Sequence, residues 1–144
     1  MHKTPLFLTS LLLAGLLAVT GCVTISAAKL SGSDWKLVSY GPPSMQTPAV
    51  PNVAAKLTFG ADGSMTGTLG CNSLGGSYTV KDDKITFGSI VSTMMACADP
   101  QMKQEGAALE VLKGTVEFKL SGSTLTITSA DGSGVLTFTA LSSS

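Results

Sequence analysis

Apolar and polar residues alternate with a period of two over most of the chain from residue 30 onward. Glycine, serine and aspartate interrupt the alternation at short intervals, which is typical of strands joined by tight turns. The clearest hairpin signal is the turn at residues 60–63, between two alternating runs. Prolines in the segment 41–51 disfavour strand pairing, so a loop is expected there. The pattern predicts about eight strands, at residues 35–39, 55–59, 64–68, 77–80, 84–87, 116–120, 125–127 and 136–140.

One segment has the longer period of a helix, downstream of Val91, where a more buried stretch is expected to begin. Asp99 is the predicted N-cap, Pro100 suits the first helical position, and the helix is expected over residues 101–113, before Gly114. The fold class that follows is mainly β with one helix (α+β), a small antiparallel β-barrel or half-barrel with a single helix packed against it. Three apolar residues define the helical face that is expected to contact the sheet: Met102, Leu109 and Leu112.

The N-terminal residues have a different pattern, a charged start followed by a 14-residue apolar stretch over residues 6–19. Lys3 provides the charge, and Gly21 is the small residue that a signal peptidase requires beside its cleavage site. Residues 17–22, Leu-Ala-Val-Thr-Gly-Cys, predict a lipobox, in which the thiol of Cys22 is the site of lipid attachment, as palmitate. The expected organisation has three parts: a lipoprotein signal peptide at 1–21, a lipidated tether at 22–29 and a folded domain at 30–141.

A membrane-spanning segment and an unlipidated secretory signal are the two alternatives. A span requires about 20 apolar residues to cross roughly 30 Å of hydrocarbon, which is more than residues 6–19 provide. An unlipidated signal more often has an Ala-x-Ala pattern before its cut, whereas here Gly21 precedes a cysteine. Val23, and not aspartate, follows that cysteine. By resemblance to Gram-negative lipoproteins, this favours attachment to the outer membrane, facing the periplasm.

Composition limits the function of the part that follows the signal. It has 123 of the 144 residues, enough for one domain, with eight lysines, nine acidic residues and no arginine. A formal net charge of −1 predicts no basic surface for nucleic acid. The single histidine, His2, lies in the signal, which excludes Ser-His-Asp and Cys-His catalysis and the usual nitrogen ligands of zinc. We therefore expect a monomeric, non-enzymatic domain without cofactor or metal.

Ten residues in a fixed order carry a resemblance to a known family: Trp35, Gly70, Cys71, Asn72, Tyr78, Thr93, Met94, Met95, Cys97 and Glu105. Over roughly residues 30–141, the chain resembles the META domain of HslJ-like bacterial lipoproteins. The resemblance implies a compact β-rich domain with one helix, an envelope setting, and a link to heat or drug stress. A more distant similarity is to the cracked barrels of type III secretion pilot lipoproteins, whose interior can hold acyl chains.

Cys71 and Cys97 are the two thiols that remain once Cys22 is acylated. In an oxidising periplasm such a pair usually forms a disulfide, which we expect here. A bridge that closes a loop of about 27 residues contributes roughly 3.5 kcal/mol in the chain-entropy model. The alternative is two separate buried cysteines that pack as small apolar groups.

The methionines beside Cys97 suggest a second possible chemistry, capture of a soft metal such as Cu(I). Met94 and Met95 are adjacent, so in an extended segment they point to opposite faces and do not share one site without a turn. A disulfide between Cys71 and Cys97 would also consume both thiolates. Packing of the methionines in the core is therefore the favoured interpretation.

Asn72 and Glu105 are the polar residues in suggestive positions. Asn72 lies near glycines, where its amide suits a left-handed turn bonded to nearby backbone. Glu105 lies on the apolar side of the predicted helix, where a half-buried carboxylate either anchors a ligand or proton, or accepts hydrogen bonds from loop amides. The structural role is favoured. Trp35 and Tyr78 are expected to be core and rim aromatics rather than a sugar platform.

Three functions follow from these observations. The first is a lipid-anchored envelope protein that contributes to stress or drug tolerance by binding or supporting another envelope component. The second is a carrier or pilot-like module that holds an acyl chain or an apolar partner segment in a half-barrel cavity. The third is a hydrolase built on serine and lysine. A dry core in which Trp35, Met95, Leu109 and Phe118 meet favours the first, and an open apolar interior favours the second.

Overall fold

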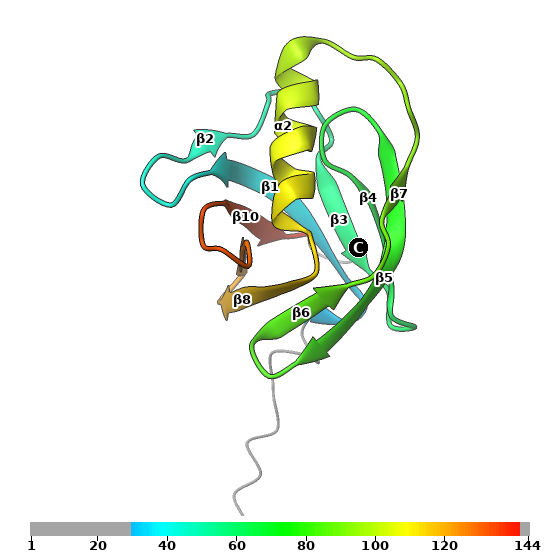
Figure 1. The fold of residues 1–144 in the computed structure, drawn as a ribbon, viewed down its shortest axis with the longest axis vertical. Coiled ribbons are helices and arrows are strands. Elements are labelled where there is room, and N and C mark those ends of the chain that lie inside the picture. The colour runs from blue at the N-terminus through cyan, green and yellow to red at the C-terminus, as the bar shows by residue number, and fades with distance from the viewer. Residues whose placement is uncertain (1–29, 142–144) are drawn as a thin grey trace, which may run out of the picture.

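The computed structural model describes residues 30–141, so the predicted signal peptide, the tether and Cys22 lie outside the described residues. The helix and the strands follow one another in the order β1 (Ser33–Gly41), β2 (Thr47–Pro48), β3 (Lys56–Phe59), β4 (Ser64–Thr68), β5 (Ser73–Lys81), β6 (Lys84–Phe87), β7 (Val91–Ser92), α2 (Asp99–Val111), β8 (Thr115–Ser121), β9 (Thr124–Thr128) and β10 (Val135–Ala140). Figure 1 shows their arrangement, with α2 on one side of the curved sheet.

Eight of the strands form a closed antiparallel barrel, which confirms the predicted fold class. Their order is β10-β9-β8-β6-β5-β4-β3-β1, and β1 closes the ring by pairing with β10. Along this closing seam Trp35 lies opposite Ala140, and Leu37 lies opposite Phe138. The two-residue strands β2 and β7 are additions to the outside of the ring, paired with β1 and β5 respectively.

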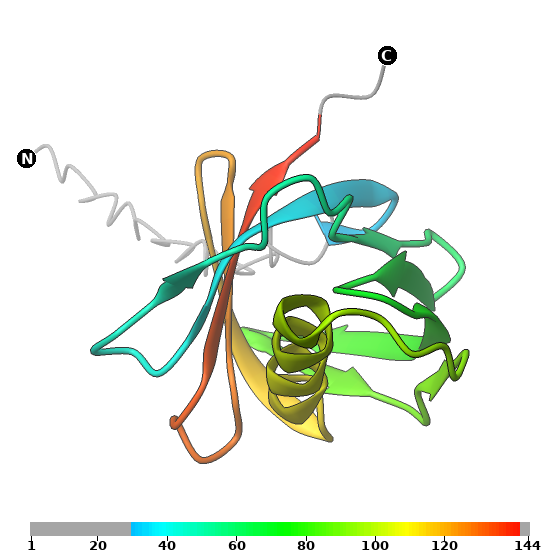
Figure 2. The same ribbon diagram turned by 90° about the horizontal axis from the view of Figure 1, so that it is seen from above.

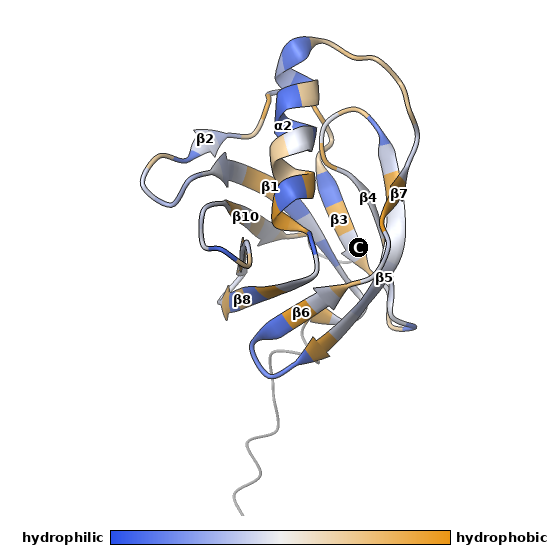
Figure 3. Ribbon diagram, in the orientation of Figure 1, coloured by the Kyte–Doolittle hydropathy of each residue, from blue (hydrophilic) through white to orange (hydrophobic). Residues whose placement is uncertain are grey.

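The interior of the barrel is filled by apolar side chains. Because successive residues of a strand point to opposite faces, the alternating pattern sends one apolar set inward. Figure 3 shows this alternation along the strands. Phe59 and Phe138 are fully buried, and Tyr78 packs edge-to-face on Phe59 with ring centroids 4.9 Å apart. Each buried side chain of this size contributes about 1.5–3 kcal/mol relative to an exposed one.

Helix α2 lies within the curve that the strands describe, and it contacts β1 and β10 (Figure 2). The expected range of 101–113 is displaced by two residues at each end, because the helix runs from Asp99 to Val111. Ala98 is the N-cap, without a side-chain capping bond, and Asp99 is the first helical residue, so the prediction of Asp99 as the cap is wrong. The helix ends at Val111, and Gly114 follows with φ +67°, a conformation that suits glycine.

The buried face of α2 is rotated from the predicted one. Met102 keeps 38% of its surface exposed, and the fully buried positions are centred on Gln104 and Ala108. Leu112 is buried as predicted, and Leu109 packs at the edge of the core. The polar side chains on this face find partners in neighbouring loops, which hydropathy alone does not reveal.

Two further predictions about strands are wrong in detail. Val91 is 70% exposed and does not begin a buried stretch. Pro48 belongs to β2, inside the segment that was expected to be an unpaired loop. Because β2 lies at an outer edge, the missing N–H of proline leaves no ladder bond unmade. The backbone N–H of the next residue, Ala49, donates to the carbonyl of Val38 at 2.8 Å. Among the described residues, no helix has both the length and the hydrophobicity needed to cross a membrane.

Candidate functional site

Three segments far apart in the sequence meet around the side chain of Asn72. We call the group Cys71, Asn72, Thr93, Met95 and Glu105 the Asn72 cluster. The first two residues precede β5, the next two follow β7, and Glu105 lies on the buried face of α2. The Nδ2 of Asn72 donates to Oε1 of Glu105 at 2.7 Å. The cluster thereby joins the start of β5 to the helix.

The amide oxygen of Asn72 binds the segment that follows β7. Its Oδ1 accepts hydrogen bonds from the hydroxyl of Thr93 at 2.9 Å and from the backbone N–H of Met95 at 2.7 Å. The backbone N–H of Ser73 donates to the Thr93 hydroxyl at 3.1 Å. The predicted left-handed turn at Asn72 is wrong, since the non-glycine residues with positive φ in residues 30–141 are Asn52 and Asp82. Asn72 instead bonds residues 21 to 33 positions away.

The carboxylate of Glu105 accepts hydrogen bonds on both oxygens. Its Oε2 accepts the backbone N–H groups of Cys71 and Asn72 at 2.7 and 2.6 Å. Burial acts to raise the pKa of Glu105, but the Asn72 side chain and the two backbone N–H groups outweigh it, so the pKa lies below its usual value of 4.5. Hydrogen bonding to loop amides is the role that the sequence favours for this residue. A carboxylate so engaged is an anchor for the loop and not a poised proton donor.

The close approach between this loop and the helix depends on Gly70. A Cβ atom at Gly70 would lie 2.2 Å from the carbonyl oxygen of Gln101 and 2.8 Å from the Cβ of Glu105. Only glycine allows the backbone to come near enough for the next two N–H groups to reach Glu105. Residues 70–72 therefore act together, since Gly70 allows the close approach and Cys71 and Asn72 donate their backbone N–H groups to the Glu105 carboxylate.

Cys71 and Cys97 form a disulfide, with Cα atoms 5.9 Å apart and a sequence separation of 26 positions. This confirms the predicted pairing. The bond joins the loop before β5 to the residues that lead into α2, beside the hydrogen bonds of Asn72. The same short segment is thus held covalently and by polar contacts.

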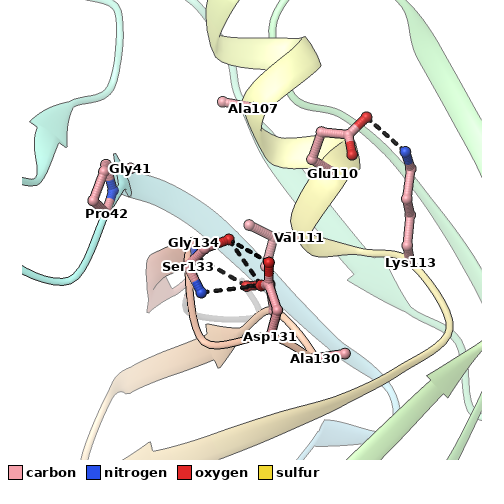
Figure 4. A pocket seen from close by; sticks show the side chains of 11 residues that line it. Gly41, Pro42, Ala107, Glu110, Val111, Lys113, Ala130, Asp131, Ser133 and Gly134 are labelled. Atoms are coloured by element: carbon pink, nitrogen blue, oxygen red, sulfur yellow. Dashed lines mark hydrogen bonds and ion pairs between the residues drawn. The ribbon is translucent and has the colours of Figure 1, made fainter.

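A separate surface cavity of about 410 Å³ lies between α2 and the turn that joins β9 to β10 (Figure 4). Lys113 and Glu110 form an exposed ion pair at 2.6 Å on its rim. The hydroxyl of Ser129, and then the backbone N–H and hydroxyl of Ser133, lower the pKa of Asp131 to about 2. Because Asp131 bonds within its own turn, this cavity offers a polar rim without a nucleophile–base pair.

The comparison with protein families identifies the family of this chain. The model of the META domain matches residues 28–142, which include the barrel, α2 and the whole Asn72 cluster. The chain belongs to the META domain family. No curated protein matches it.

Solved structures share the fold of this META domain at low sequence identity. An NMR structure of a protein from Burkholderia xenovorans has a TM-score of 0.68 at 24% identity, covering 81% of this chain and 87% of that one. A second NMR structure has a TM-score of 0.63 at 21% identity, over 80% of this chain and 94% of that one. A DUF4847 family protein from Bacteroides vulgatus has a TM-score of 0.56 at 13% identity, over 76% and 93%. These likenesses establish the fold.

The two aromatic residues of the predicted motif lie in the META barrel and not in the cluster. Trp35 is 3% exposed, and its Nε1 donates to the hydroxyl of Ser33 at 2.6 Å. Tyr78 is 7% exposed, and its hydroxyl donates to the carbonyl of Gly60 at 2.8 Å. Both rings are buried, so neither presents a flat face for a sugar.

The methionines of the motif contradict the expectation that they pack in the core. Met94 is 98% exposed and Met95 is 53% exposed. Met95 therefore does not meet Trp35 and Phe118 in a dry core, although those two are buried. The backbone of Met95 belongs to the Asn72 cluster, whereas its side chain lies at the surface.

Gln104 is a structurally important residue that the sequence does not single out. Its side chain is fully buried; Nε2 donates to the carbonyl of Leu69 at 2.6 Å, and Oε1 accepts the N–H of Val50 at 2.6 Å. It fastens α2 to the loops before β3 and β5, next to the bonds of Glu105. The one feature of the sequence that indicates burial of Gln104 is its position one helical turn before Ala108, on the same face of α2.

Proposed function

We propose that this META domain protein is a non-enzymatic, lipid-anchored component of the bacterial envelope that contributes to stress or drug tolerance by binding or supporting another envelope component. The observation that carries the proposal is the Cys71–Cys97 disulfide. Structural disulfides persist in oxidising compartments such as the periplasm. The lipobox that ends at Cys22 directs the chain to the same compartment.

The polar groups support a binding or scaffolding role over catalysis. Both carboxylate oxygens of Glu105 and both ends of the Asn72 amide are engaged within the fold. Residues 22–144 contain no histidine and no arginine. An activated nucleophile needs an adjacent base held in place, and this part of the chain has no imidazole for that role.

The filled barrel supports this function over the carrier alternative. Apolar side chains from all around the ring meet in one cluster, with Phe59, Phe138 and Ile127 fully buried. A carrier needs room for an acyl chain, as the cavities that hold small ligands occupy about 300–1,000 Å³. The cavity of about 410 Å³ is a surface feature outside the barrel core.

The anchor would keep the domain near the bilayer. Val23, after the acylated cysteine, favours the outer membrane. Residues 22–29 fully extended span at most about 28 Å, which confines the domain to the periplasmic surface of that membrane. A partner on the same membrane, or one in the thin space above it, is therefore within reach.

The test of the proposal is substitution of the acylated cysteine. Cys22→Ser should abolish palmitate labelling and move the chain from the detergent phase to the aqueous phase. The double variant Cys71→Ser/Cys97→Ser is the matched control, because it removes two thiols and leaves the lipid in place. If Cys22→Ser keeps its label and its detergent partitioning, the anchored function is wrong.

The physiological part has its own measurement. A strain without this protein should survive heat or drug challenge less well than the parent. The wild-type chain should restore survival, and the Cys22→Ser chain should not. Equal survival of all strains under both challenges would contradict the proposed contribution to tolerance.

A further inference from the structure

The segment Val91–Pro100 is unusual because every one of its residues is exposed. It nevertheless contains apolar side chains, and Met94 is 98% exposed. Methionine is ordinarily among the buried residue types, so two adjacent methionines at the surface are uncommon. Met95 is also exposed, at 53%.

The backbone beneath these side chains is nevertheless held in place. The N–H of Thr93 donates to the carbonyl of Ser73 at 3.0 Å, and the N–H of Met95 donates to Asn72 at 2.7 Å. Two residues later the disulfide at Cys97 fixes the chain again. Met94 lies between these restraints. The two thioethers are therefore displayed by a secured backbone and not by a loose loop.

We propose that Met94 and Met95 form a surface site of reversible oxidation by an electrophilic oxidant of the hypochlorous acid class. The thioether sulfur attacks the chlorine of hypochlorous acid and forms a chlorosulfonium ion as hydroxide leaves. Water then displaces chloride and yields the sulfoxide, so the sulfur is oxidised by two electrons and the products are chloride and a proton. A methionine sulfoxide reductase reverses the change: a pair of thiols becomes a disulfide, and the oxygen leaves as water.

The position of the pair explains why the fold tolerates the modification. A sulfoxide is polar and disrupts a core, but the side chains of Met94 and Met95 are not part of one. Met65 provides the contrast inside the same protein. It is fully buried in β4, opposite Phe59, and its oxidation would place a polar group in the barrel interior.

This inference deepens the proposed function and rests on it for the choice of stress, because it names an oxidant as the agent. The chemistry itself is independent of lipid anchoring. Failure of the Cys22→Ser test would therefore leave the oxidation result standing, and failure of the oxidation test would leave the anchor standing.

The experiment exposes the full chain, purified from cells, to a few molar equivalents of hypochlorous acid and maps sulfoxides by peptide mass spectrometry. Met94 and Met95 should oxidise at least about tenfold faster than Met65, because access to sulfur sets the rate. The melting temperature should stay unchanged, and a pair of methionine sulfoxide reductases, one for each sulfoxide epimer, should restore the original peptide masses. Equal rates for Met94, Met95 and Met65, a fall in melting temperature on oxidation of the pair, or sulfoxides that the two reductases together cannot remove would each overturn the proposal.

A variant pair extends the test to cells. Met94→Leu/Met95→Leu removes both sulfurs and keeps the side-chain volume, and Val91→Leu changes the same exposed segment without removing sulfur. Cells with the double variant should survive hypochlorous acid less well than the wild type, and cells with Val91→Leu should survive equally well. Survival of the double variant at the wild-type level would show that the site has no protective role, even where heat and drug tolerance still depend on the protein.

Discussion

The barrel interior and the segment Val91–Pro100 are held by opposite means. The interior contains many apolar side chains that share the stabilisation, among them Phe59 and Phe138 at 0% exposure. The segment buries no side chain; its start pairs with β5 through β7, and beyond that pairing it is held by Asn72 and one disulfide. Stability is therefore distributed over many side chains in the barrel and concentrated in a few bonds at the loop. Damage to the barrel should be costly and global, and damage at Asn72 should be smaller and local.

The largest expected effect belongs to the barrel. Phe138→Ala removes a fully buried ring from the closing seam and should lower the free energy of unfolding by about 3–5 kcal/mol. Urea unfolding followed by circular dichroism measures it. Phe138→Leu, which keeps most of the volume, should cost less than about 1.5 kcal/mol. Equal costs for the two variants would show that this position is loosely packed.

Removal of the disulfide should rank second. Cys71→Ser/Cys97→Ser releases a closure of 26 positions and should cost about 3.5 kcal/mol, since the cross-link restricts the unfolded chain. The same urea experiment on oxidised and reduced wild-type protein provides the control, and the reduced protein should match the double variant. An unchanged midpoint after reduction would contradict this account of the loop.

A smaller and pH-dependent effect is expected at Glu105. Glu105→Gln places an amide NH₂ against N–H donors and should cost about 1–3 kcal/mol at pH 7. Because the folded pKa of Glu105 is lowered, its contribution is complete above about pH 5 and is lost as pH falls below 4.5 toward the folded pKa.

The stability difference between wild type and Glu105→Gln should therefore shrink on acidification. Chemical unfolding at a series of pH values measures it. Glu110→Gln is the matched control, because its ion pair with Lys113 is exposed and should contribute about 0–1 kcal/mol. A difference that grows as pH falls would show that the pKa shift has the opposite sign.

The smallest effect should come from the exposed side chain of Met94. Met94→Ser removes no packing and should change the free energy of unfolding by less than about 0.5 kcal/mol. Thermal melts of the two proteins check this expectation. A large loss of stability would contradict this expectation, because it would mean that the side chain of Met94 makes packing contacts in the folded protein.

The barrel was predictable because its information is local. Each strand shows the period of two in its own residues, as in the run from Lys56 to Phe59, and turn residues mark the ends. The disulfide followed from compartment and cysteine count. The additions at the edges, such as β2 with Pro48, depend on a neighbour across space, which a period does not reveal.

The sequence singled out the residues of the Asn72 cluster but did not predict the contacts between them. Asn72 and Glu105 stand out as polar residues in suggestive places, but they are 33 positions apart, and nothing local states that they meet. The same limit explains the helix. Gln104 faces inward because Leu69 and Val50 supply partners, so the buried face departs from the apolar stripe that includes Met102.

Asn72 holds the residues that follow β7 independently of the barrel interior, and hydrogen exchange in a variant of Asn72 can measure this independence. In Asn72→Ala, with the disulfide intact, the amide of Met95 loses its acceptor, whereas the amide of Phe118 keeps its bond to Asp83 at 2.9 Å in the barrel. Exchange at Met95 should accelerate at least about tenfold more than exchange at Phe118, which corresponds to about 1.4 kcal/mol of local stability. Acceleration of both amides by the same factor would contradict the claim, because it would mean that the segment and the barrel open together.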